Sequence, residues 1–180
     1  MCSNVLFQLL RSFSYRDRKV FLKLYVSYVR PHLEFASPAW NPWLQKDIKI
    51  IERVQEKFVK NVQGLRATDY LGRLAELGIM SMENRRMYLD LIETFKIIKS
   101  YNNVDCSEYF MLNRDVTRPS TRSNDCALNI VLGRCNLDIR RKFFNMRVGP
   151  IWNQLPTELK ETASLTKFKN DLKNFMMSNY

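Results

Sequence analysis

Apolar side chains recur at intervals of three and four residues along most of this sequence, which is the spacing of an amphipathic helix. The clearest case is the set Ile48, Ile51, Val54, Phe58 and Val62, which predicts a helix over 46–63. Comparable patterns predict further helices over 4–13, 15–30, 69–77, 82–100, 138–154 and, finally, from 165 to 175. The chain should therefore be mainly α, folded as an irregular helical bundle.

Helix-breaking residues predict where these helices end. Pro31 should kink or interrupt the helix over 15–30, and Gly64 and Gly78 should cap the helices that precede them. The polar segment 113–125 predicts a loop. The short apolar run ALNIVL predicts at most one short strand or hairpin near 127–132, ended by Gly133.

The charge of the chain indicates which class of partner it can bind. The 180 residues carry a net charge of +11, and the charge is uneven: residues 1–66 carry +7, residues 67–112 carry −2 and residues 113–180 carry +6. A field of this sign attracts polyanions such as nucleic acid. Two basic ends around a weakly acidic middle predict either two contact surfaces or one surface made by both ends.

Targeting signals are not evident in the sequence. The first residues lack a basic stretch followed by an apolar run, and no apolar run approaches the roughly 18–20 residues that span a membrane. The four cysteines have no Cys-x-x-Cys spacing, which favours free thiols in a reducing compartment. We therefore expect no membrane contact and an intracellular location, cytoplasmic or nuclear, rather than secretion.

The sequence lacks the residue patterns of the common catalytic sites. Its one histidine, His32, is the only residue around which a nucleophile–histidine pair could form, and it stands beside Pro31 in an apolar segment. The five glycines are scattered, and adjacent aspartates that could hold two metal ions are absent from the sequence. We expect no enzyme activity, no metal, no cofactor and no small-molecule substrate.

Basic residues gather in two places outside the predicted apolar faces. One set is Arg11, Arg16, Arg18, Lys19, Lys23 and Arg30, around the junction of the first two predicted helices. The other is Arg134, Arg140, Arg141, Lys142 and Arg147, interleaved with Phe143 and Phe144. Such side chains can neutralise phosphates, although basic residues on an ordinary solvated helix face would show the same pattern. The two phenylalanines are better explained as core residues than as platforms on which bases stack.

Four segments carry a family resemblance. The first is RDRKVFLKLYVSYVRPHLEFASPAWNPW, from Arg16 to Trp43. The second is carried by Ile51, Glu52, Val54 and Gln55; the third by Leu77, Gly78, Ser81, Arg85 and Arg86; and the fourth by Phe143, Phe144, Arg147, Trp152, Asn153, Leu155 and Pro156. In this order they resemble the region downstream of the reverse-transcriptase palm in jockey-like non-LTR retrotransposons, whose members usually have tyrosine where Phe35 stands.

The resemblance implies a thumb-like basic helical region over 1–66 and the C-terminal helical segment of the retroelement protein over 67–180. The fingers, the palm with its catalytic aspartates and any endonuclease would lie upstream, which makes this chain a non-catalytic part of an RNA-directed DNA polymerase. Its partner would be RNA or an RNA/DNA duplex. The residues expected to contact nucleic acid are Arg11, Arg16, Arg18, Lys19, Lys23, Lys46, Lys49, Arg53, Lys57, Arg140, Arg141 and Lys142.

Other motif residues are expected to be structural. Arg30 and Glu34 stand four residues apart and should form an ion pair that holds the helix after Pro31. Trp40, Arg147, Trp152, Asn153 and Pro156 are assigned to the same structural class.

Two alternatives to nucleic-acid binding remain open. The chain could be a helical interaction module that packs on a protein, normally the palm of a reverse transcriptase, or a relic with no independent activity. A contiguous basic face would favour nucleic acid, and an exposed apolar patch would favour a protein partner.

Overall fold

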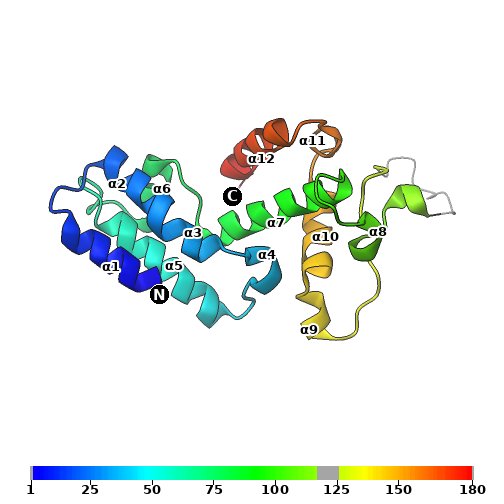
Figure 1. Ribbon diagram of the computed structural model, residues 1–180, viewed down its shortest axis with the longest axis horizontal. Helices are drawn as coiled ribbons and strands as arrows, with labels where there is room; N and C mark the ends of the chain where they lie inside the picture. The colour runs from blue at the N-terminus through cyan, green and yellow to red at the C-terminus, as the bar shows by residue number, and fades with distance from the viewer. Residues whose placement is uncertain (1, 117–125, 180) are drawn as a thin grey trace. The chain divides into compact units, whose positions relative to one another are not determined.

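The computed structural model describes residues 2–116 and 126–179, which fold into helices and connecting turns (Figure 1). Strands are absent from the described residues, and 127–132 contribute an isolated antiparallel bridge between Leu112 and Ile130. The expectation of a mainly α irregular bundle is thus confirmed. Residues 117–125 of the predicted loop lie outside the described part of the chain.

The chain divides into two compact units, one ending at Arg86 and the other beginning at Met87. The first unit contains α1 (Cys2–Ser12), α2 (Arg18–Leu24), a π-helical turn η1 (Tyr25–Val29), α3 (Arg30–Glu34), α4 (Ser37–Trp40), α5 (Gln45–Lys60) and α6 (Tyr70–Leu77). The second contains most of α7 (Met82–Ile98), then α8 (Cys106–Tyr109), η2 (Asn113–Asp115), α9 (Asp138–Arg141), α10 (Phe144–Gln154), α11 (Thr157–Glu161) and α12 (Leu165–Asn179).

The first unit extends to Arg86, past residue 66, at which the thumb-like region is expected to end. Leu74 of α6 and Met82 of α7 belong to the same buried cluster as Phe58 of α5 and Val62 in the turn after α5. The carboxylate of Glu52 accepts the backbone N–H of Met82 at 3.1 Å. Residues 67–86 therefore complete the core of the first unit.

Aromatic stacking holds the core of the first unit together. Phe58 of α5 is fully buried and lies between two rings, with centroids 5.2 Å from Phe21 and 4.2 Å from Tyr25. Leu6 and Leu9 of α1 join the same cluster. α5 is therefore fixed to α2 and η1 along one face, and its opposite face is left to solvent.

The predicted interruption at Pro31 occurs one turn earlier, as a wide helical turn. The N–H of Arg30 donates to the carbonyl of Tyr25, five residues back, and α3 then starts with Pro31 in its first turn. Because proline has no N–H, the regular ladder cannot continue through it, and a wide turn is one way to accommodate the loss. The helix stops at Glu34, before Ala36 adopts a left-handed φ of 51°.

The two predicted glycine caps had different outcomes. Gly78 caps α6 with a φ of 62°, in agreement with the sequence. α5 instead ends at Lys60 with Asn61 as its C-cap, and Gly64 takes its φ of 81° in the turn that follows. The helix ends earlier because the Asn61 side chain donates to the Lys57 carbonyl at 2.7 Å.

The second unit is built around α7, α10 and α12. The rings of Phe95 and Phe168 stack with centroids 4.0 Å apart, and Trp152, fully buried, packs against Phe168 at 6.1 Å. The single helix predicted over 138–154 is instead two helices, α9 and α10, separated at Lys142 and Phe143. Phe143 is 59% exposed, which corrects the expectation that it is core, whereas Phe144 packs against Phe110 at 5.9 Å.

Candidate nucleic-acid interface

A line of five cations runs along the solvent face of α5. Its members are exposed and follow one another at intervals of three and four residues: Lys46, Lys49, Arg53, Lys57 and Lys60. At 100° per residue they fall within a sector of roughly 80° and extend over about 21 Å. We call this line the basic stripe.

The basic stripe lies opposite the buried face of α5. Gln55, Phe58 and Val59 are buried, and on a helical wheel they are centred about 180° from the stripe. Packing therefore fixes the direction in which the cations point. Two acids of this helix flank the stripe. Glu56 is exposed and stands three residues after Arg53 and four before Lys60, whereas Glu52 accepts hydrogen bonds from the Tyr70 hydroxyl and the Met82 N–H.

The lysines of α2 lie on a different side of the first unit. Lys19 and Lys23 are exposed, whereas Phe21 and Tyr25, on the other side of the same segment, stack on Phe58. Phe58 in turn belongs to the face of α5 opposite the stripe. The two basic sets consequently point away from each other and do not form one surface.

Two of the arginines predicted to contact nucleic acid are engaged within the protein. Arg16 donates to the side-chain oxygen of Asn61 and the carbonyl of Leu10, both at 3.0 Å, and so ties the α1–α2 connection to the end of α5. Arg18 forms an ion pair with Glu76 at 2.9 Å. Arg11 is exposed at the C-terminal end of α1.

In the second unit the predicted contact residues lie on and after α9. Arg140, Arg141 and Lys142 are exposed. Arg141 pairs with Asp138 at 3.2 Å and also donates to the Cys135 carbonyl. α9 has a single turn, so this set is much shorter than the basic stripe.

Motif residues from separate segments form buried polar contacts in the first unit. Glu34 accepts from Arg30 at 3.2 Å, as the sequence predicted, and also from Arg85 at 2.8 and 3.3 Å. Arg86, almost fully buried, donates to the side chain of Asn41 at 2.9 Å. No local pattern indicates that Arg85 and Arg86 contact residues of the first motif, because the segments are far apart in the chain.

A second polar cluster centres on Gln55. Its side-chain oxygen accepts from the Tyr25 hydroxyl at 2.8 Å, and its nitrogen donates to the Met80 carbonyl at 2.9 Å. Burial raises the pKa of Tyr25 above its ordinary value, so this phenol keeps its proton and stays a donor. A hydroxyl and an amide thus align α5 with η1 inside an apolar core.

The fourth motif is structural in the second unit. The guanidinium of Arg147 binds both carboxylate oxygens of Asp90, each at 3.0 Å. The indole N–H of Trp152 donates to Leu128 at 2.8 Å, and the Asn153 side chain exchanges two hydrogen bonds with the backbone of Ile130. Pro156 begins the turn into α11, where its carbonyl accepts from Leu159.

Trp40, the remaining residue assigned a structural role, donates its indole N–H to the Phe35 carbonyl. Its side chain is 43% exposed, so the hydrogen bond fixes the ring at the surface of α4 rather than in the core.

Metal and membrane sites are not seen in the part of the chain that the structure describes. Within it, no group of three or more histidine, cysteine or acidic side chains could hold a metal ion. None of the described helices is both long and apolar enough to cross a membrane. Cys106, Cys126 and Cys135 are free cysteines, as expected.

The fold and the exposed charges define a helical protein with a basic face on its first unit. No family model matches the chain, and no solved structure matches it. It is similar to an uncharacterized protein, B0403.1, of Caenorhabditis elegans, with 29% identity over 105 residues that cover 57% of this chain and 50% of that protein. The chain thus spans about half the length of the curated relative it matches.

Proposed function

We propose that the first unit binds the backbone of RNA or an RNA/DNA duplex through the basic stripe of α5, as a non-catalytic, thumb-like part of a retrotransposon reverse transcriptase. The observation that carries this proposal is the stripe itself: five exposed cations at helical spacing on a helix whose other face is fixed in the core.

The stripe has the dimensions of a backbone contact. One strand of a B-form duplex has a phosphate about every 3.4 Å along the axis and winds around that axis. A straight stripe of about 21 Å can therefore contact several phosphates where the backbone passes it. Lysine and arginine at these positions neutralise phosphates and release counterions, and they read no base. Binding should therefore be strong at low salt and nearly independent of sequence.

Residues from three of the resembling segments meet in the fold of the first unit. Glu34, Gln55, Arg85 and Arg86 belong to three of the quoted motifs, and each bonds to a residue from another segment. These contacts hold the three segments together in one folded unit.

The test is fluorescence anisotropy of the folded protein with a labelled RNA/DNA hybrid at several salt concentrations. The double variant Lys49→Gln/Arg53→Gln is expected to lose affinity on the order of 10–100-fold at 0.1 M salt and to reduce the slope of log K against log salt by about two. The loss follows from two phosphate contacts removed from the centre of the stripe.

The matched control is Lys19→Gln/Lys23→Gln, which removes two exposed charges from the side of α2 that points away from the stripe. It should change affinity far less than the stripe variant. Equal losses in the two variants would place the contact elsewhere or make it a general effect of net charge. Absence of binding at low salt by a folded protein would contradict the proposal.

A protein partner is the second candidate, and a specific observation favours it. Large apolar side chains between residues 28 and 44 are exposed: Tyr28 60%, Phe35 80%, Trp40 43% and Trp43 54%. Aromatic side chains at a surface often pack against another protein, which in the family that this chain resembles would be the palm. If Phe35→Ser leaves nucleic-acid binding intact, this surface lies outside the nucleic-acid contact and is free for a protein partner; a loss of nucleic-acid binding by the folded variant would contradict this second candidate.

A further inference from the structure

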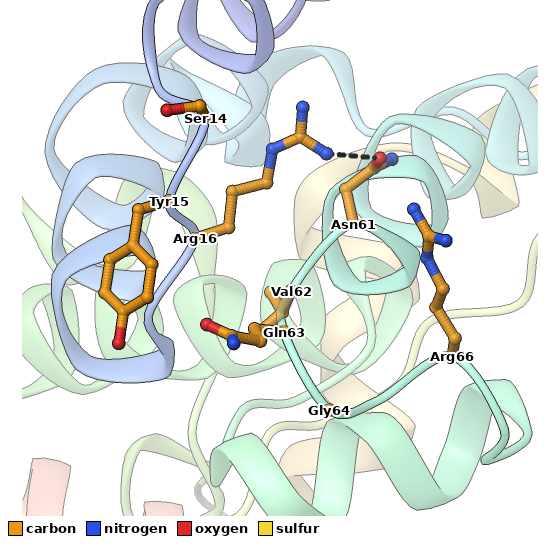
Figure 2. A pocket seen from close by; sticks show the side chains of 8 residues that line it. All are labelled: Ser14, Tyr15, Arg16, Asn61, Val62, Gln63, Gly64 and Arg66. Carbon is orange, nitrogen blue, oxygen red and sulfur yellow. Dashed lines mark hydrogen bonds between the residues drawn. The ribbon is translucent and has the colours of Figure 1, made fainter.

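A pocket of about 360 Å³ lies in the first unit, where the α1–α2 connection meets the chain that leaves α5. Figure 2 shows Tyr15 and Arg16 on the α1–α2 connection and Asn61, Gln63 and Arg66 on the segment after α5. The volume is at the lower end of the roughly 300–1,000 Å³ typical of ligand sites. Among the described residues that line it, none carries a carboxylate.

Two guanidinium groups make this pocket electropositive. Arg16 is held by three neutral oxygens, those of Asn61, Leu10 and Phe13, at 3.0, 3.0 and 3.3 Å. Its charge is therefore fixed in place without being neutralised by these contacts. Arg66 is exposed on the opposite wall of the pocket.

The nearest acid in the sequence is already engaged in the fold. The carboxylate of Asp17 accepts the backbone N–H groups of Lys19 and Val20 at 3.0 and 3.2 Å, and so caps α2. The C-terminal end of α5 carries a negative charge equivalent to about half an elementary charge, which repels an anion. Asp17 keeps its negative charge but does not line the pocket, and the two guanidinium charges that do line it exceed the half charge of the helix end.

An aromatic ring completes the set of groups at this pocket. Tyr15 lines it and is 72% exposed, so one face of the ring is accessible to a ligand. Phosphate-binding cations beside an exposed aromatic ring form the combination that holds single-stranded nucleic acid, with the backbone on the charges and a base on the ring.

We propose that this pocket binds one nucleotide of a single strand, with its phosphate between Arg16 and Arg66 and its base stacked on Tyr15. The proposal rests on the proposed function and extends it. The pocket follows Lys60, the last residue of the basic stripe, so a strand that runs along α5 and leaves its duplex would enter here.

The test compares two hairpin duplexes of the same sequence with the full chain, each labelled in the hairpin loop and measured by fluorescence anisotropy. One duplex is blunt, and the other carries a single-stranded 3′ overhang of several nucleotides. The overhang should tighten binding about ten-fold, an effect of the size that base stacking on an aromatic side chain produces.

Tyr15→Ala and Arg66→Ala should each remove most of this gain and leave the affinity for the blunt duplex nearly unchanged. Both residues are exposed, so the fold should survive, which circular dichroism would verify. Lys23→Ala, on α2, is the matched control and should preserve the ratio of the two affinities.

The outcomes separate this inference from the proposed function. Equal affinities of the unmodified chain for the two probes, or a gain that persists in both pocket variants, would overturn the pocket while leaving duplex binding by α5 in place. If neither probe binds to the folded chain, both proposals are wrong.

Discussion

Replacing Arg147 by methionine is expected to lower the free energy of unfolding by about 3–5 kcal/mol. The guanidinium binds both carboxylate oxygens of Asp90, which is only 4% exposed. Methionine would leave that carboxylate in the core without its bidentate partner. Desolvated carboxylates are costly when their charged partner is removed. Chemical denaturation followed by circular dichroism would measure the loss.

The chain offers a matched control for this variant. Arg141 and Asp138 also form an arginine–aspartate pair, at 3.2 Å, but their side chains are 60% and 89% exposed. Arg141→Met should change the free energy of unfolding by less than about 1 kcal/mol. A double replacement, Asp90→Leu/Arg147→Met, should recover much of the stability lost in the single variant, because the uncompensated charge is gone. Equal effects of Arg147→Met and Arg141→Met would contradict the role given to burial.

Phe58→Ala is expected to destabilise the first unit by about 3–5 kcal/mol. Phe58 is fully buried, and alanine would remove the ring on which both Phe21 and Tyr25 stack. The basic stripe depends on the same packing, since that packing sets which face of α5 points to solvent. Denaturation and duplex affinity should therefore be measured on the same sample.

Ile50→Ala serves as the control on the same helix, because Ile50 is 57% exposed. It should alter the free energy of unfolding by no more than about 0.5 kcal/mol. If Phe58→Ala weakens binding of the hybrid at a temperature where the protein is still folded, then the affinity depends on the orientation of α5 and not only on the stability of the fold. A Phe58→Ala protein as stable as the native one would refute the stacked core.

Local patterns in the sequence predicted the longer helices well. The three- and four-residue spacing of Ile48, Ile51, Val54 and Phe58 places α5 within three residues of its observed ends, Gln45 and Lys60. Gly78 was predicted as a cap because only a residue tolerant of positive φ suits that position. The short helices α4, α8 and α11 have no counterpart among the predicted helices, since one turn is too short to show a period.

The candidate interface was harder to predict because sequence shows a charge but not what compensates it. The stripe could be derived, as its members repeat on one helix. The engagement of Arg16 by Asn61, 45 positions away, and of Arg147 by Asp90, 57 positions away, depends on tertiary contacts that no local pattern contains. The same limit applies to Lys19 and the stripe, which are both among the residues expected to contact nucleic acid: the sequence does not show that they point away from each other.

The wide turn at Tyr25–Val29 has a consequence for the whole first motif. Phe21, Tyr25, Val29 and Leu33 are all buried although they repeat every four residues, a spacing that would drift around a regular helix by about 40° at each step. The turn absorbs this drift. Deleting one residue from it would rotate α3 by about 100° and carry Glu34 away from Arg85. The number of residues in this turn therefore sets the rotation of α3 about its axis, and the ion pair between Glu34 and Arg85 forms only while that number is kept.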